Sequence, residues 1–214
     1  FTSDNGALDR STAPGDPDAG SGSNLPLRGS KGTTWEGGQR VPAVFRWPGR
    51  IAAGRRTVEH ASSLDLFPTL VALAGAELPR DRTIDGVDIS SLLFDEMATS
   101  PRTTFAYYFM NDLNAVRDAR WKLHVARDGQ QVKELYDLSS DRSERHDAAD
   151  DHPEVVARLL GEAERYREEL GDARTGRTGR GVRPVGRVSD PRPLTVYDPT
   201  HPYVIAEYDL PDRG

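Results

Sequence analysis

The stretch Phe105–Asp137, FAYYFMNDLNAVRDARWKLHVARDGQQVKELYD, contains four short runs rich in aromatic and β-branched residues, with turn residues between them. Such runs are typical of β-strands. Asp128-Gly129 lies between the last two runs and is a strong signal for a tight hairpin. The pattern predicts a small antiparallel sheet with strands at Phe105–Phe109, Leu113–Arg117, Trp121–Ala126 and Lys133–Asp137.

A helix is predicted directly after this sheet. Asp151-His-Pro-Glu is a typical helix start, and Gly171 supplies the stop. The apolar positions between them recur at helical spacing, namely Val155, Val156, Leu159, Leu160, Ala163, Tyr166 and Leu170. This helix therefore has one apolar face that can cover the sheet.

Fewer elements are predicted before the sheet. Residues 7–30 are rich in Asp, Gly, Ser and Pro, which predicts a long loop. Arg40–Trp47 has the composition of a strand, and Ser62–Gly75 has that of a helix with Asp65 as its N-cap. Ile89–Leu93 is expected to form a short turn.

The last forty residues have little apolar content at first. Residues 172–193 are expected to be a linker or a wrapping tail, and Leu194–Tyr197 with Tyr203–Ala206 could form a late strand pair. Phe1-Thr2-Ser3 reads as the end of a strand, without an initiator Met. We therefore expect that an upstream part is missing.

Composition excludes several classes of function. The chain of 214 residues has 28 Lys and Arg against 34 Asp and Glu, a net charge of −6, which argues against nucleic-acid binding. It has no Cys, so disulfides, thiolate metal sites and a Cys nucleophile are excluded within it. Its apolar runs are far shorter than the roughly 18 residues of a membrane span, so no membrane partner is predicted.

Asp4 and Asn5, in Ser3-Asp4-Asn5-Gly6, are the first candidate site. They follow a predicted strand, and ligands of α/β sheets bind at the carboxyl ends of strands. A carboxylate beside an amide offers the hard oxygen donors that Ca²⁺ or Mg²⁺ prefers. The alternative is a simple turn, because Asp, Asn and Gly dominate turns for conformational reasons.

The glycine-rich segment, Leu27–Arg40, is the second candidate. Its four glycines allow close backbone approach, and Arg28, Lys31 and Arg40 add positive charge, which together could cradle an anion. The spacing excludes a Walker loop. The alternative, which composition by itself favours, is a flexible, solvated loop.

Other catalytic patterns are missing from the sequence. The five histidines, His60, His124, His146, His152 and His201, show no pairing at i,i+4, so no zinc site is predicted. His124 is expected to be a half-exposed sheet residue, and His152 to belong to a helix cap. No Gly-x-Ser-x-Gly sequence supports a serine hydrolase.

Taken together, these segments resemble the C-terminal half of a type I, formylglycine-dependent sulfatase of the arylsulfatase family. The resemblance covers about residues 1 to 170 and depends on an ordered series of motifs. These are Phe1–Gly6, Leu27–Pro42, Arg46–Ile51, Asp65–Leu70, Asp85-Gly86, Ala115–Arg117, Trp121–His124 and Glu134–Leu138.

The resemblance implies an α/β fold. It consists of the C-terminal part of an alkaline-phosphatase-like core, over residues 1–100, and a small antiparallel sheet with a packed helix, over residues 101–171. Residues 172–214 would be an extended tail. A periplasmic or secreted location is plausible from the family.

The resemblance also implies roles for three residues. Asp4 and Asn5 would complete a divalent-cation site, usually for Ca²⁺, with Mg²⁺ as the alternative. Lys31 would contact the sulfate of the substrate, a sulfated small molecule or carbohydrate, and act in catalysis by stabilising charge. These implications favour the cation site and the anion cradle over their structural alternatives.

One part of the family pattern is missing. The formylglycine nucleophile arises in a Cys/Ser-x-Pro-x-Arg motif, and this sequence contains neither a Cys nor Ser-x-Pro-x-Arg. We therefore expect the nucleophile in a missing N-terminal half and expect this chain alone to be inactive. The alternatives are a phosphate or phosphonate monoester hydrolase of the same superfamily, or a non-catalytic sulfate-binding relic.

Overall fold

The computed structural model of the protein describes residues 1–8, 22–187 and 189. The chain divides into a first unit, Phe1–Val182, and a second unit, Arg183–Gly214. All helices and strands of the described residues belong to the first unit. Much of the predicted loop at 7–30 and the whole predicted strand pair at 194–206 lie outside the described residues.

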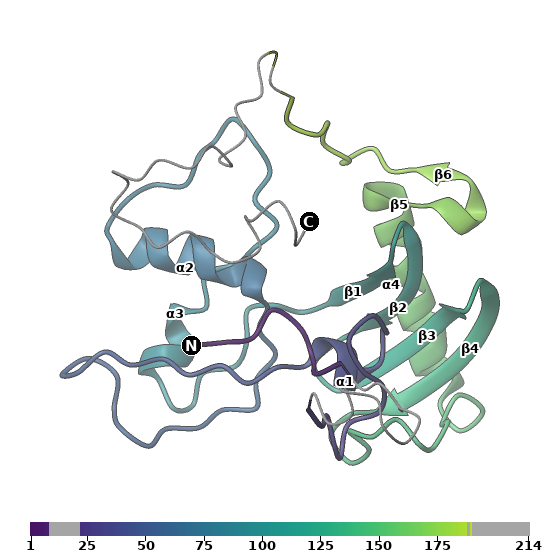
Figure 1. Ribbon diagram of the computed structural model, residues 1–214, viewed down its shortest axis with the longest axis horizontal. Helices are drawn as coiled ribbons and strands as arrows, with labels where there is room; N and C mark the ends of the chain where they lie inside the picture. Colours follow the sequence, from purple (N-terminus) through teal and green to yellow (C-terminus); the bar gives the residue numbers. More distant parts are fainter. Residues whose placement is uncertain (9–21, 188, 190–214) are drawn as a thin grey trace, which may run out of the picture. The chain divides into compact units, whose positions relative to one another are not determined.

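A four-stranded antiparallel sheet with the order β1-β2-β3-β4 forms as predicted (Figure 1). At the β3–β4 hairpin, Asp128 and Gly129 have φ angles of 50° and 74°. Positive φ at both central residues is the geometry that favours Asp-Gly in tight hairpins. The strands are β1 (Phe105–Phe109), β2 (Asp112–Arg117), β3 (Trp121–Arg127) and β4 (Gln130–Asp137).

Helix α4 (Pro153–Leu170) covers one face of this sheet, with Pro153 in its first turn and Gly171 at its C-cap. Its Leu159 and Ala163 are fully buried. They belong to the same apolar cluster as residues from three strands and from the loop after β4, a cluster that also includes Leu113, Val116, Trp121, Leu123, Val125, Leu135, Ala149 and Val156. The predicted packing of an amphipathic helix on the sheet is confirmed.

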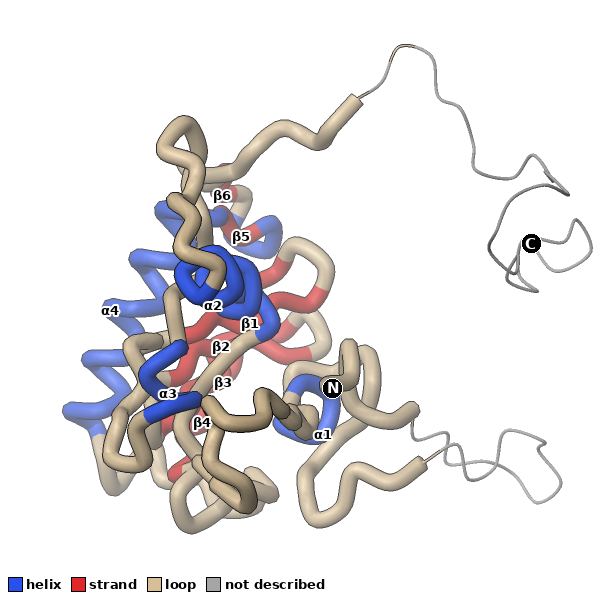
Figure 2. Tube along the Cα trace, turned by 90° about the vertical axis from the view of Figure 1, so that its left-hand side faces the viewer, coloured by secondary structure: helices blue, strands red, loops and turns tan. Residues whose placement is uncertain are grey.

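Strand β3 is buried on both faces. Side chains alternate between the two faces of a strand, so Leu123 and Val125 belong to the cluster under α4, whereas Lys122 and His124 lie on the other face. Figure 2 shows that helix α1 (Glu36–Gln39) lies on the side of the sheet opposite α4. The prediction of a half-exposed His124 was wrong, because the glycine-rich segment covers this face.

The predicted helix at Ser62–Gly75 is present as a 3₁₀ turn η1 (Ser63–Asp65) followed by α2 (Leu66–Leu73). Asp65 occupies the N-cap position of α2, as predicted, but its side chain makes no cap hydrogen bond there. Ser62 is the N-cap of η1, where Ser62 and Asp65 form a reciprocal capping box. The Asp65 carboxylate is buried and also binds Arg102 and the backbone N–H of Val87. The predicted turn near Ile89 is helix α3 (Ser90–Phe94).

The predicted strand Arg40–Trp47 does not form as a regular element. It is joined to the beginning of the chain by one isolated antiparallel bridge, Thr2–Ala43. The backbone N–H of Val44 donates to Phe1 O at 2.8 Å beside this bridge. A single bridge is too short to be a strand, although both segments run together as extended chain.

The first part of the predicted linker is ordered. A small hairpin joins β5 (Gly171–Asp172) to β6 (Arg177–Thr178), with the 3₁₀ turn η2 (Ala173–Thr175) between them. Asp172 is buried, and its carboxylate binds Arg167 of α4 at 2.9 Å. This ion pair fixes the hairpin against the end of the helix.

Candidate functional site

Asp4 and Asn5 lie in a bend near the start of the chain. Asp4 Oδ1 accepts the backbone N–H of Asn5 at 3.0 Å, and Ser3 Oγ donates to Asn5 O at 2.9 Å. Asp4 is exposed, and the structure shows a partner for only one of its carboxylate oxygens. The chain bends at Asp4 and Asn5, and within the described residues one carboxylate oxygen of Asp4 has no hydrogen-bond partner.

The glycine-rich segment is tightly folded, not a solvated loop. The N–H of Gly6 donates to Gly38 O at 3.0 Å, and that of Gly37 to Arg28 O at 2.7 Å. A Cβ atom at Gly6 would lie 1.8 Å from Gly37 O, and a Cβ atom at Gly37 would lie 2.3 Å from Gly29 O. Only glycine allows this approach of backbone to backbone.

These contacts place Lys31 beside the bend that holds Asp4. The backbone N–H of Lys31 donates to Ala7 O at 3.0 Å. The side chain of Asn24 connects the same two segments, because its amide donates to Ala7 O at 2.8 Å and to Gly29 O at 3.2 Å. The Lys31 side chain is exposed, and among the described residues no ion pair is found for it. The structure thus joins the backbones of the two segments that carry the sequence-predicted site residues.

A buried charge cluster, which consists of Glu36, Lys122, His124 and Glu144, lies beneath the glycine-rich segment. Lys122 Nζ lies 3.1 Å from Glu36 Oε1 and 2.9 Å from Glu144 Oε1. It also donates to Thr34 O at 2.7 Å. All four side chains of the cluster are at most 1% exposed. Buried charges of this kind are tolerated only when they are paired and hydrogen-bonded.

Further groups around Glu36 fix its charge state. Tyr107 donates its hydroxyl to Glu36 Oε1 at 3.0 Å, and Arg117 Nη1 lies 3.4 Å from Glu36 Oε2. Burial by itself would raise the pKa of Glu36, but the charges on Lys122 and Arg117 outweigh it and lower the pKa. Burial and then the Glu36 charge raise the pKa of Tyr107. Glu36 is therefore a carboxylate and Tyr107 a neutral hydrogen-bond donor at neutral pH.

His124 is neutral in the cluster. Burial lowers its pKa, against the opposing effect of its hydrogen bond to Glu144. Because Glu144 Oε1, 3.0 Å away, accepts a hydrogen bond, the proton of the neutral ring belongs on Nε2. Nδ1 is buried without a partner in the described structure. The Nε2–H of His124 thus helps to orient the Glu144 carboxylate.

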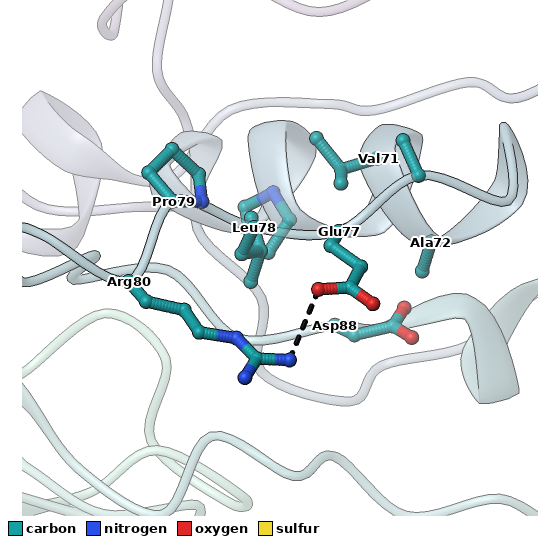
Figure 3. A pocket seen from close by; sticks show the side chains of 9 residues that line it. Val71, Ala72, Glu77, Leu78, Pro79, Arg80 and Asp88 are labelled. Atoms are coloured by element: carbon teal, nitrogen blue, oxygen red, sulfur yellow. Dashed lines mark hydrogen bonds and ion pairs between the residues drawn. The ribbon is translucent and has the colours of Figure 1, made fainter.

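One hollow among the described residues lies away from the candidate site residues. Figure 3 shows it beside α2, where the exposed residues Glu77 and Arg80 form an ion pair at 3.0 Å. Asp4, Asn5 and Lys31 do not line it.

Among residues 1–8, 22–187 and 189, no group of three or more His, Cys, Asp or Glu side chains could hold a metal. In the same residues, no helix has the length and apolar character needed to cross a membrane.

Sequence reasoning missed the buried charge cluster. Lys122 and His124 alternate with apolar residues in β3, which is the pattern of a strand with a solvent-facing side. Glu144 lies in a polar loop, which gives no signal of burial. The four glycines of the glycine-rich segment indicated close backbone approach in this region, but not which side chains lie beneath it.

The chain matches a known protein family. Residues 30–169 match the model of the family "N-sulphoglucosamine sulphohydrolase, C-terminal". The match includes most of the glycine-rich segment, with Lys31, and the sheet with its helix, and the chain belongs to this family. The resemblance to the C-terminal half of a sulfatase is confirmed.

Curated relatives are sulfatases. The chain is 45% identical to steryl-sulfatase of Mus musculus over 126 residues, which cover 57% of this chain and 20% of that protein. It is 39% identical to arylsulfatase A of Bos taurus over 185 residues, covering 75% of this chain and 35% of that protein. The chain thus spans a fifth to about a third of the length of these relatives.

Solved structures confirm the fold class. The PsFucS1 sulfatase from Pseudoalteromonas sp. matches with a TM-score of 0.66 and 26% identity, over 78% of this chain and 36% of that one. Ps i-CgsB in complex with k-i-k-neocarrahexaose matches with a TM-score of 0.64 and 28% identity, over 83% of this chain and 37% of that one. The chain therefore has the fold of the C-terminal part of sulfatases.

Proposed function

We propose that this chain is the C-terminal portion of a sulfatase and hydrolyses sulfate esters together with the rest of a longer polypeptide. Family membership and the sulfatase relatives support this proposal. The share of the relatives that the chain covers, 20% to 35%, supports a catalytic unit longer than these 214 residues.

The observation that carries the proposal is the position of Lys31. Its exposed ammonium has no ion-pair partner among the described residues, and its backbone is hydrogen-bonded to Ala7, three residues after Asp4. A lysine held in this way can donate charge-assisted hydrogen bonds to sulfate oxygens. We propose that Lys31 binds the sulfate and holds the negative charge that develops during cleavage.

Asp4 and Asn5 fit a divalent cation by donor chemistry. One oxygen of the exposed Asp4 carboxylate has no hydrogen-bond partner among the described residues, and the structure shows none there for the Asn5 side chain. We propose that both side chains bind Ca²⁺, with Mg²⁺ as the alternative, because hard cations prefer oxygen ligands. When bound, the cation neutralises charge on the sulfate oxygens.

The nucleophile belongs to the other part of the polypeptide in this proposal. This chain has no Cys and no Ser-x-Pro-x-Arg from which a formylglycine could arise. The role of the present residues is then to bind the sulfate, to hold the cation and to orient both. The proposed substrate is a sulfated small molecule or carbohydrate.

The test is an assay of the longer polypeptide on paired aryl sulfate and aryl phosphate esters. We expect preferential turnover of the sulfate. Preferential turnover of the phosphate would support the alternative phosphate or phosphonate ester hydrolase, which the sulfatase relatives do not favour. Binding of sulfate without turnover would support the non-catalytic relic.

A further inference from the structure

The part of the glycine-rich segment that carries Lys31 is closed at both ends by hydrogen bonds. The N–H of Gly37 donates to Arg28 O at 2.7 Å, which joins the two ends. Between them, the N–H of Thr33 donates to Ser30 O at 3.0 Å. Lys31 therefore lies on a small loop whose position depends on what holds residues 28 and 36–37.

Glu144, from the loop after β4, contacts both ends of this loop. Its backbone carbonyl accepts Arg28 Nη1 at 2.8 Å. Its side-chain Oε2 accepts the backbone N–H of Glu36 at 2.7 Å. One residue therefore binds the two positions that flank Lys31, although it lies more than a hundred residues further along the chain.

The conformation of Glu144 is itself held. Its backbone φ of 51° lies in the left-handed region, which is unfavourable for a residue with a side chain. Its carboxylate is fixed by the Lys122 ammonium at 2.9 Å and by His124 Nε2 at 3.0 Å. The buried charge cluster thus aims one carboxylate oxygen at the N–H of Glu36.

Arg28, which donates to Glu144 O, also contacts Trp35. Its guanidinium lies over the Trp35 ring, 3.8 Å from the ring centroid. His124 also contacts that ring, with a centroid distance of 4.3 Å. Trp35 is buried, so the stack connects the exposed end of the loop to the buried charge cluster.

We propose that Glu144 is a positioning residue that fixes both ends of the loop and thereby sets the position of the Lys31 ammonium. This inference rests on the proposed function, because it gives Lys31 the sulfate-binding role. Glu144 touches neither substrate nor cation in this proposal; it acts through Arg28 and Glu36.

The first test measures the loop directly. In Glu144→Gln, the single acceptor oxygen cannot serve the Glu36 N–H, Lys122 and His124 together. Amide hydrogen exchange at residues 29–33 of this chain is expected to become several-fold faster. Arg28→Met keeps an apolar stem on Trp35 and removes one hydrogen bond at an exposed position, so it should fold and show the same local effect.

The matched control is Arg120→Met. Arg120 also lies over a tryptophan, 4.7 Å from the Trp121 ring centroid, and binds Asp137 at 2.7 Å. It does not contact the glycine-rich segment, so exchange at residues 29–33 should stay as in the unmodified protein. Unchanged exchange in both Arg28→Met and Glu144→Gln would overturn the inference.

The second test is a double-mutant cycle in the longer polypeptide. If Glu144 acts by placing Lys31, Arg28→Met and Glu144→Gln should lower kcat roughly tenfold or more with a smaller change in KM. In a Lys31→Ala background, the same substitutions should have almost no further effect on kcat, because they act only through the position of the Lys31 ammonium, which that background lacks.

A destabilising control separates positioning from stability. Asp172→Asn removes a buried carboxylate that binds Arg167, away from the glycine-rich segment. Its effect on kcat should be the same in the wild-type and Lys31→Ala backgrounds. An equal decrease in kcat from Arg28→Met in the wild-type and Lys31→Ala backgrounds would contradict the positioning role of Glu144. If Lys31→Ala leaves sulfate turnover intact, the proposed function fails, and the exchange experiment still decides whether Glu144 fixes the loop.

Discussion

The backbone N–H of Lys31 donates to the carbonyl oxygen of Ala7 at 3.0 Å and joins the glycine-rich segment to the Ser3–Gly6 bend. The two segments that carry the candidate residues are therefore joined through their backbones. The first two predictions follow from this arrangement.

Lys31→Ala in the longer polypeptide should lower sulfate-ester turnover roughly 10²–10³-fold, the size typical of losing one electrostatic stabiliser. Lys31→Arg should restore little, because a planar guanidinium does not replace a compact ammonium. Steady-state kinetics on an aryl sulfate measure both. The control is Arg56→Ala, which removes another exposed cation; its neighbour Arg55 is unsuitable, since it donates to Leu93 O at 2.9 Å and caps α3. Full activity of Lys31→Ala would contradict the site.

Asp4→Ala should weaken Ca²⁺ binding more than Asn5→Ala does, because a hard cation gains most from an anionic ligand. Metal content after dialysis and calorimetric titration of the longer polypeptide provide the measurement. Glu96→Ala removes an exposed carboxylate elsewhere and should leave binding unchanged. The cation assignment is wrong if Asp4→Ala retains its full calcium content.

Gly37→Ala should destabilise the fold by about 1–3 kcal/mol, because its new Cβ would meet the backbone oxygen of Gly29. Gly161→Ala is the matched control. It lies exposed in α4 with nothing near the new Cβ, and the change should stabilise by about 0.5–1 kcal/mol. Urea unfolding curves of the two variants should move in opposite directions, and a shift in the same direction would refute the close packing of the segment.

The free energy of unfolding should decrease as the pH is lowered from about 6.5 to about 4, because of His60. Burial and then the Arg117 charge lower the pKa of His60 to about 4, against an ordinary value of 6.5. Between these two pH values His60 is protonated in the unfolded chain but not in the folded chain, so lowering the pH favours unfolding. Below about pH 4 His60 is protonated in both states, and a further decrease in pH causes no further loss of stability through His60. His60→Gln should make the urea midpoint less dependent on pH between about 6.5 and 4.5, whereas the exposed His146→Gln should not. An identical pH dependence for wild type and His60→Gln would contradict this.

The predicted domain division at residue 100 leads to a further expectation. Residues 101–171 contain the sheet, α4 and their shared core, so they should keep a cooperative thermal transition when expressed alone. Residues 1–100 expose Phe67 and Leu70 of α2 and should not fold cooperatively. Calorimetry and NMR dispersion of both parts provide the test, and a folded fragment 1–100 would refute the division.

Local elements were predictable from the sequence because their signals are local. Asp128-Gly129 defines the hairpin through its positive φ angles, and Pro153 and Gly171 bound α4. The strand predicted at Arg40–Trp47 does not form, because a strand depends on a non-local partner. A strand needs a ladder partner, and composition does not show which residues lie beside it.

The sequence by itself determined the four strands, the covering helix and the residue types of the candidate site, since alternation, helical spacing and turn chemistry act over a few residues. Tertiary structure alone decided that Lys122 and Glu36, 86 residues apart, are buried as a pair, and that Glu144 binds both ends of the loop that carries Lys31. A polar residue in an alternating strand looks the same in sequence whether it faces water or a buried partner. The free energy of a buried charge depends on which opposite charge and hydrogen-bond donors surround it, and only the folded chain brings those groups together.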